Sequence, residues 1–188
     1  VLYVGAGSGT QSITSLEFQP DFVWIKGRTD GWHVLTDSVR GAGKILASNS
    51  NDAESNTPQA FQSFDISGFT VGYNAGWYTN GSGSGASQNQ IAWCWKAGGA
   101  AVSNTNGNIT SSVSVNDEAG FSIVSYTGNG SNGQTVGHGL SQAPQWIMLK
   151  ARDATQNWRV WHHKLASDGS KRLLLDADNV SEDASFLN

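Results

Sequence analysis

Residues 74–80 place two aromatic side chains among amides, a combination of residue types that can bind sugars. Trp77 and Tyr78 lie between Asn74 and Asn80. An aromatic ring can stack on a sugar face while amide groups hydrogen-bond the hydroxyls. The alternative is that Trp77 folds back over the edge of the core, because amphipathic aromatic side chains often lie half-buried. The candidate ligand-binding residues are Asn74, Trp77, Tyr78, Asn80, Trp32 and Trp158.

The eight tryptophans divide into two groups by their neighbours. Tryptophans inside strongly apolar segments are predicted to lie in the core, because large aromatic side chains bury the most area. These are Trp24, Trp93, Trp95 and Trp146. The remaining four have polar or glycine neighbours and are not assigned to the core. These are Trp32, Trp77, Trp158 and Trp161.

Two clusters have residue types that can hold a metal ion. His162 and His163 are adjacent, and on a strand they would point to opposite faces, so we expect no shared metal. Residues 176–179, read with Glu182 and Asp183, could supply oxygens to Ca²⁺. They lack the central glycine of the helix-loop-helix calcium loop, and a solvated loop is the favoured interpretation. We therefore expect no bound metal and no cofactor, with calcium near Asp176 as the open alternative.

No pattern in the chain indicates catalysis. Cys94 is the only cysteine. Strand alternation places it on the same face as Ala92, and the favoured interpretation is a small buried apolar side chain. Residues 128–133 match G-x-G-x-x-G, but a strand-like segment follows them instead of a helix, which favours a hairpin loop over a dinucleotide site. No carboxylate pair is placed as acid and base. The sequence therefore predicts a protein that is not an enzyme.

Composition excludes two classes of partner. Charged residues are 14% of the 188 residues, the net charge is −4, and no basic run is longer than Lys171-Arg172. Binding along a nucleic-acid backbone needs a clustered positive surface, so no nucleic acid is expected. No apolar run reaches the roughly 18 residues that a membrane-spanning helix needs, so no membrane insertion is expected.

Short apolar segments separated by Gly, Asn, Ser and Asp predict an all-β fold. Residues 22–25 are continuously apolar and predict a central strand covered on both faces. The pattern D-x-x-G-F-[ST]-[VI] occurs at 65–71 and again at 117–123, and it predicts a tight turn that opens a strand. The expected strands are 2–4, 12–18, 22–26, 32–37, 44–47, 60–64, 68–72, 90–96, 112–115, 121–126, 134–136, 146–150, 158–162 and 171–175. Residues 103–111 are expected to be a polar connection.

The chain also contains a long internal repeat. The offset between matching residues is 123 from Tyr3 to Tyr126, 124 from Pro20 to Pro144, and 126 from Trp32 to Trp158. A period this long indicates a duplicated unit the size of a domain. We predict a jelly-roll-like β-sandwich built from two tandem related units. Residues 1–100 would form an N-terminally clipped first copy and residues 101–188 a C-terminally truncated second copy, so the chain reads as part of a longer array.

Several segments resemble a repeat of tailed-bacteriophage structural proteins, frequent in marine phages and often described as tail or tail-fibre proteins. The matching segments are 18–26, 33–42, 68–72, 92–99, 126–130, 136–140, 143–144 and 150–152. The resemblance covers nearly the whole chain and rests on structural motifs. It carries no catalytic residues over to this chain.

The resemblance implies a virion location and a non-enzymatic structural role. The leading expectation is a tail-fibre or tail-associated adhesin segment that contacts a host surface glycan. By analogy with fibres, it would be a homo-oligomer, a trimer, bound to other virion proteins. The alternatives are a capsid decoration or head-fibre protein, and a secreted carbohydrate-binding module or accessory domain of a glycan-degrading enzyme.

Overall fold

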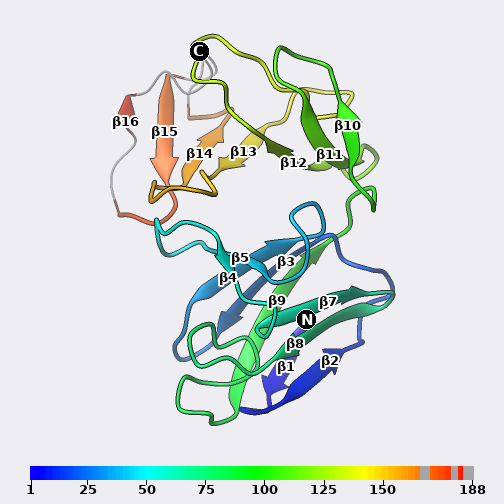
Figure 1. Cartoon of the computed structure of the whole chain (residues 1–188), viewed down its shortest axis with the longest axis vertical. Helices are drawn as coiled ribbons and strands as arrows, with labels where there is room; N and C mark the ends of the chain where they lie inside the picture. The colour runs from blue at the N-terminus through cyan, green and yellow to red at the C-terminus, as the bar shows by residue number, and fades with distance from the viewer. Residues whose placement is uncertain (166–169, 179–181, 184–188) are drawn as a thin grey trace.

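The computed structural model describes residues 1–165, 170–178 and 182–183. Within these ranges the regular secondary structure consists of antiparallel strands, and none of the described residues is helical. The all-β prediction is therefore confirmed. Strands β1–β9 form the lower part of the molecule in Figure 1 and β10–β16 the upper part, called here the N-terminal and C-terminal halves.

The N-terminal half is a β-sandwich of two sheets. The six-stranded sheet has the order β1 (Leu2–Gly5), β9 (Gln88–Trp95), β3 (Phe22–Gly27), β4 (His33–Asp37), β5 (Lys44–Ala47) and β6 (Ser55–Asn56). The three-stranded sheet has the order β2 (Thr10–Ile13), β8 (Gly68–Gly72) and β7 (Phe61–Asp65). The two sheets enclose a core that includes Phe61, Phe69 and Val71. The sandwich prediction is confirmed, and the jelly-roll likeness stays a prediction.

Strand β3 is covered on both faces, as its continuous apolar run predicts. Val23 and Ile25 point into the sandwich core and are almost fully buried. Phe22 and Trp24 point to the opposite face, called the outer face, where they pack in a second apolar cluster. That cluster joins the two halves, so the outer face of the six-stranded sheet is itself an interior surface over β3.

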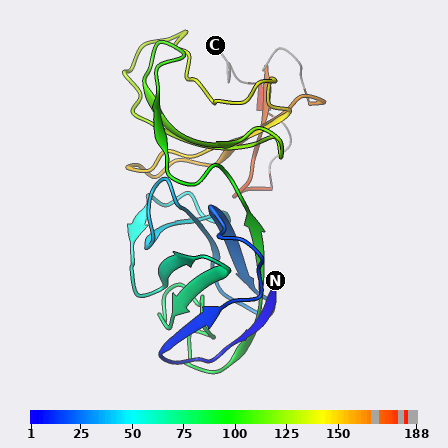
Figure 2. The same ribbon diagram turned by 90° about the vertical axis from the view of Figure 1, so that its right-hand side faces the viewer.

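The C-terminal half contains two further sheets. A three-stranded sheet has the order β10 (Val102–Asn104), β11 (Ser111–Asn116) and β12 (Phe121–Tyr126). A four-stranded sheet has the order β13 (Trp146–Leu149), β14 (Arg159–His162), β15 (Lys171–Leu174) and β16 (Glu182–Asp183). In Figure 2 this half lies directly above the N-terminal half.

The four-stranded sheet packs face to face on the six-stranded sheet. Leu35 and Leu46 of the outer face form one buried cluster with Trp158, and Met148 and Leu175 pack against it. The indole Nε1 of Trp158 donates a hydrogen bond to the carbonyl oxygen of Ala47 at 2.7 Å. The halves are therefore joined by an apolar contact with a directed hydrogen bond inside it.

Strand order and local hydrogen bonding recur between the two halves. The order β3-β4-β5-β6 matches β13-β14-β15-β16. The backbone N–H of His33 donates to Asn49 Oδ1 at 3.0 Å, and that of Trp158 donates to Asp176 Oδ1 at 2.9 Å. These hydrogen bonds make Trp158 equivalent to His33, whereas the sequence repeat pairs Trp158 with Trp32, the residue before His33. The recurrence fits the predicted tandem duplication, which stays a prediction.

Several short segments differ from the predicted strands. The strand expected at 12–18 is β2, which covers Thr10–Ile13, and residues 14–18 form no strand. Residues 134–136 form no strand, and Val136 makes only isolated bridges to Gly107 and Ile109. Strands β6, β10 and β16 were not predicted, because segments of two or three residues carry too little alternation to identify. β10 overlaps the segment 103–111, expected to be a polar connection, at Ser103 and Asn104.

Candidate functional site

Trp32 and Trp77 form an aromatic pair between two loops of the N-terminal half. Their ring centroids are 5.9 Å apart, with planes tilted by 49°. Trp32 directly precedes β4 and is 37% exposed. Trp77 is partly buried, packs against the sandwich core, and donates its Nε1 hydrogen to Thr57 Oγ1 at 3.1 Å. Trp77 therefore lies over the core edge and supports the more exposed ring of Trp32.

Asn74 shapes the loop that carries Trp77. Its Oδ1 accepts the backbone N–H of Gly76 at 2.9 Å, an interaction typical of Asn in turns. Its carbonyl oxygen accepts the N–H groups of Trp77 and Tyr78, both at 3.1 Å. Asn74 therefore fixes the backbone on which both aromatic residues sit.

Tyr78 joins the two loops by packing. Its φ is 56°, the positive value that is uncommon for a residue with a side chain, and its carbonyl oxygen accepts Gln90 Nε2 at 2.8 Å. A Cβ on Gly31 would clash with the Tyr78 ring. Glycine at position 31 therefore lets the turn before β4 approach the ring, which brings Trp32 beside Trp77.

Two of the predicted ligand-binding residues are buried. Asn80 has no exposed surface; its Oδ1 accepts the N–H of Ala6, and its Nδ2 donates to the carbonyl oxygens of Ser8 and Gly9. Trp158 is 5% exposed between the halves. Neither side chain can reach an external ligand in this arrangement. Asn80 instead holds the glycine-rich loop 5–9 by its hydrogen bonds, and Trp158 stabilises the interface between the two halves.

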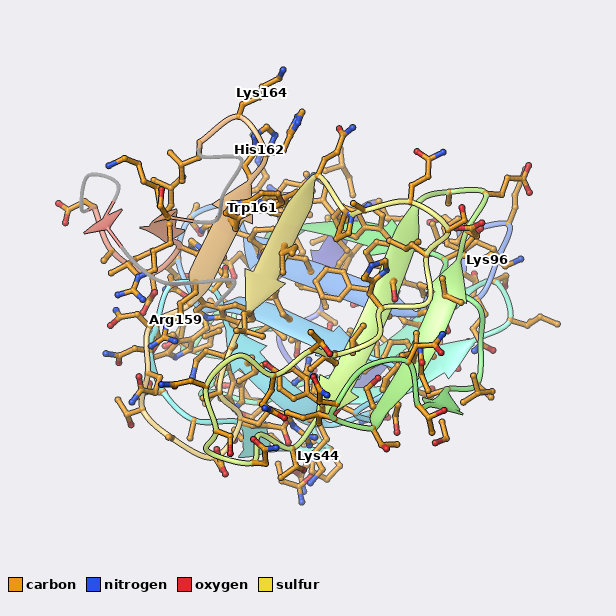
Figure 3. The ribbon with its side chains drawn as sticks, turned by 90° about the horizontal axis from the view of Figure 1, so that it is seen from above. Lys44, Lys96, Arg159, Trp161, His162 and Lys164 are labelled. Carbon is orange, nitrogen blue, oxygen red and sulfur yellow. The ribbon has the colours of Figure 1, made fainter. Side chains whose placement is uncertain are left out.

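The predicted division of the tryptophans is largely reversed. The apolar segments predict a core position for Trp93, Trp95 and Trp146, but these side chains are 44%, 37% and 50% exposed. Trp161 was not assigned to the core but is 7% exposed. Apolar neighbours along the chain indicate a strand, and burial depends on which face of that strand is covered. Figure 3 shows Trp161 on β14 between Arg159 and His162.

A hollow of about 550 Å³ lies at the junction of the halves, beside Asp21, Lys96 and Asn116. The Asp21 carboxylate is buried and accepts hydrogen bonds from Ala97 N–H at 2.8 Å, from Gly99 N–H at 3.3 Å and from Ser38 Oγ at 2.8 Å. Asp21 therefore holds the connection after β9 in place.

An ion-pair chain crosses the interface between the halves. Arg152 contacts Glu54 through two nitrogens, at 2.8 and 3.0 Å, and Arg40 contacts the same carboxylate at 3.0 Å. Arg40 also pairs with Asp37. Burial on its own raises the pKa of Glu54, but the hydrogen bonds from Arg152 and Arg40 outweigh it and leave that pKa below its usual value.

The candidate calcium ligand Asp176 is hydrogen-bonded within the protein, and the Cys94 thiol is partly buried. Both carboxylate oxygens of Asp176 are engaged, Oδ1 with Trp158 N–H and Oδ2 with Asn157 Nδ2. Burial raises the pKa of the Cys94 thiol to about 11, so the thiol stays protonated at neutral pH. Asn179 lies outside the described residues, and only the backbone is described for Glu182 and Asp183.

The two histidines differ from their predicted placement. His163 lies just beyond β14, and its ring centroid is 4.8 Å from that of His162, so the rings do not point to opposite faces. Burial, with His162 and Lys164 nearby, lowers the pKa of His163. In the described ranges no group of three or more His, Cys, Asp and Glu residues could hold a metal ion.

The predicted ligand-binding residues that the structure brings together near the surface are Trp32, Trp77, Asn74 and Tyr78. An exposed indole supported by a second indole suits stacking on an apolar ligand face.

No helix among the described residues has the length and apolar character needed to cross a bilayer. No curated protein matches the chain, and no solved structure matches it. A family model described as a domain of unknown function, DUF7483, matches residues 1–188, and the chain therefore belongs to that family.

Proposed function

We propose that the chain is a non-enzymatic structural segment of a bacteriophage virion, part of a tail fibre or tail-associated adhesin that contacts a host surface glycan. The motif resemblance to phage tail repeats supports the virion. The recurring strand order of the two halves supports a protein built from repeated units. Repeated units on one chain raise avidity without any new contact.

The observation that carries the glycan proposal is the Trp32–Trp77 pair. Trp32 offers ring surface to solvent, while Trp77 is held from below by the core and by Thr57. A platform that is already rigid loses little conformational entropy when a sugar stacks on it. Asn74 lies on the same loop and provides an amide for sugar hydroxyls.

The site is tested by glycan-array binding of the wild-type chain, Trp32→Ala and Trp146→Ala. Trp146 is exposed but lies on β13, so its replacement is the matched control. We expect Trp32→Ala to lose binding and Trp146→Ala to keep it, with unchanged melting temperatures for both. Binding that survives Trp32→Ala would contradict the proposed platform.

The location is tested by immunogold electron microscopy of phage particles, with antibody raised against the chain. Label on the tail or its fibres is expected. Label over the head would instead indicate a capsid decoration or head-fibre protein. Unlabelled particles, together with glycan binding by the isolated chain, would favour the secreted carbohydrate-binding module.

A further inference from the structure

The outer face of strands β1 and β9 is an exposed apolar strip. Leu2, Val4, Trp93 and Trp95 are 73%, 56%, 44% and 37% exposed. Leu2 lies opposite Ile91 in the β1–β9 register, which makes the strip continuous across both strands. The alternate residues Tyr3 and Ala92 point into the sandwich core. Contiguous exposed apolar surface of this kind marks an interaction site more often than scattered single residues do.

The side chains of the strip are uncharged. Two charged groups border it: the Val1 ammonium, which donates to the Ala92 carbonyl oxygen at 2.7 Å, and Lys26, which lies opposite Ile91 in the β3–β9 register. Residues 1–5 read Val-Leu-Tyr-Val-Gly and residues 91–95 read Ile-Ala-Trp-Cys-Trp, so every side chain in both segments is uncharged. Exposed strands of monomeric proteins are often protected by charged residues or proline. At the edge of β1, an uncharged side chain takes this place: Gln11 Nε2 donates to the Val4 carbonyl oxygen at 3.1 Å. The open surface is therefore the face of the strip.

The strip is continuous with the interface between the halves. Trp93 lies opposite Trp24 in the β3–β9 register, and their ring centroids are 5.8 Å apart. Trp24 packs in the cluster that contains Trp158 and Met148 of the C-terminal half. Over β3–β5 this sheet face is therefore covered by another sheet. On β9 it is covered only in part, because Trp95 stacks on Phe121 of β12 with ring centroids 6.2 Å apart while Trp95 and Trp93 stay 37% and 44% exposed.

We propose that this strip binds the same strip of a second copy of the chain, forming a dimer about a two-fold axis. The same sheet face already binds a β-sheet over β3–β5, so an apolar sheet face is the surface that fits it. A two-fold contact uses one surface twice, and an uncharged apolar strip can contact itself without like-charge repulsion. The proposal is independent of glycan binding, and it gives a dimer in place of the trimer expected by analogy.

Sedimentation velocity of the full chain over a wide concentration range tests the dimer. The weight-average mass is expected to rise from the 19.9 kDa of one chain toward twice that value. Leu2→Glu and Leu2→Lys each place like charges close together across the axis, and each alone should stay monomeric. Mixing the two variants should restore the dimer, because opposite charges then face each other.

Ile66→Glu is the matched control, because Ile66 is 87% exposed in the turn between β7 and β8. This variant should dimerise like the wild type. A wild-type chain that stays monomeric at every concentration overturns the proposal, and so does a dimer that both Leu2 variants retain. A monomeric chain whose binding to a neutral oligosaccharide is lost in Trp93→Ala would assign the strip to a glycan and also overturn the dimer.

Discussion

Trp158 donates its indole N–H to the carbonyl oxygen of Ala47, 111 positions earlier in the chain, at 2.7 Å. Both groups are buried at the contact between the four-stranded and six-stranded sheets. A buried indole N–H and a buried carbonyl oxygen each need a partner, because leaving either unpaired costs free energy. This pair therefore selects one arrangement of the two halves among the many that apolar contact alone would allow.

Replacing Trp158 with Phe should weaken the joint between the halves. A smaller aromatic ring remains, and the Ala47 carbonyl oxygen loses its buried donor, which by itself should lower the free energy of unfolding by about 1–3 kcal/mol. Equilibrium denaturation in urea measures the loss. Trp146→Phe is the control, and it should change stability by no more than about 0.5 kcal/mol because Trp146 is half exposed. Equal effects of the two substitutions would contradict the assigned role of the hydrogen bond.

Glu54 should make the stability of the chain depend on pH. Its pKa in the folded chain lies below the usual value, so its ionised form stabilises the fold above the unfolded pKa of about 4.3. That contribution is lost as the pH falls through the folded pKa. Wild type should therefore melt at a higher temperature than Glu54→Gln at neutral pH, and the difference should shrink on acidification.

Thermal melts of both proteins from neutral to acidic pH check this expectation. Glu118→Gln, on the exposed turn after β11, is the control and should run parallel to the wild type. A melting-temperature difference between wild type and Glu54→Gln that stays constant with pH would show that the carboxylate contributes only packing.

Replacing Trp77 should lower the stability of the fold, whereas replacing Trp32 should not. Trp77→Ala removes a ring packed on the sandwich core and should lose a large part of the about 3–5 kcal/mol that truncating a core aromatic costs. Trp32→Ala removes a more exposed ring and should leave the free energy of unfolding nearly unchanged. Urea denaturation of both variants measures the contrast. A stable Trp77→Ala variant would be evidence against the support role of this ring.

Asn80→Ala should destabilise the N-terminal half. The change leaves the Ala6 N–H and the Ser8 and Gly9 carbonyl oxygens without the Asn80 side chain as partner, at a cost of about 1–3 kcal/mol. Asn129→Ala is the matched control, because Asn129 lies in an exposed glycine-rich loop. Melting temperatures of both variants test this role. An unchanged melting temperature for Asn80→Ala would mean that loop 5–9 does not depend on its buried amide.

The local elements were predictable because their signals are local. The bounds of β5, β8 and β12 match the expected segments, since alternation and turn residues lie within a few positions of each strand. The aromatic loop site was partly predictable for the same reason. Trp32, Trp77, Tyr78 and Asn74 lie on two adjacent loops, and their types indicate stacking and amide hydrogen bonding.

By itself, then, the sequence determined the class of fold, most strands and the two loops of the candidate site. The tertiary structure decided which tryptophans are buried. Trp146 opens β13 and Trp158 directly precedes the neighbouring strand β14, yet Trp158 is 5% exposed and Trp146 is 50% exposed. The difference arises because Trp158 lies against Ala47 of the other half, a contact between residues 111 positions apart that no local pattern encodes.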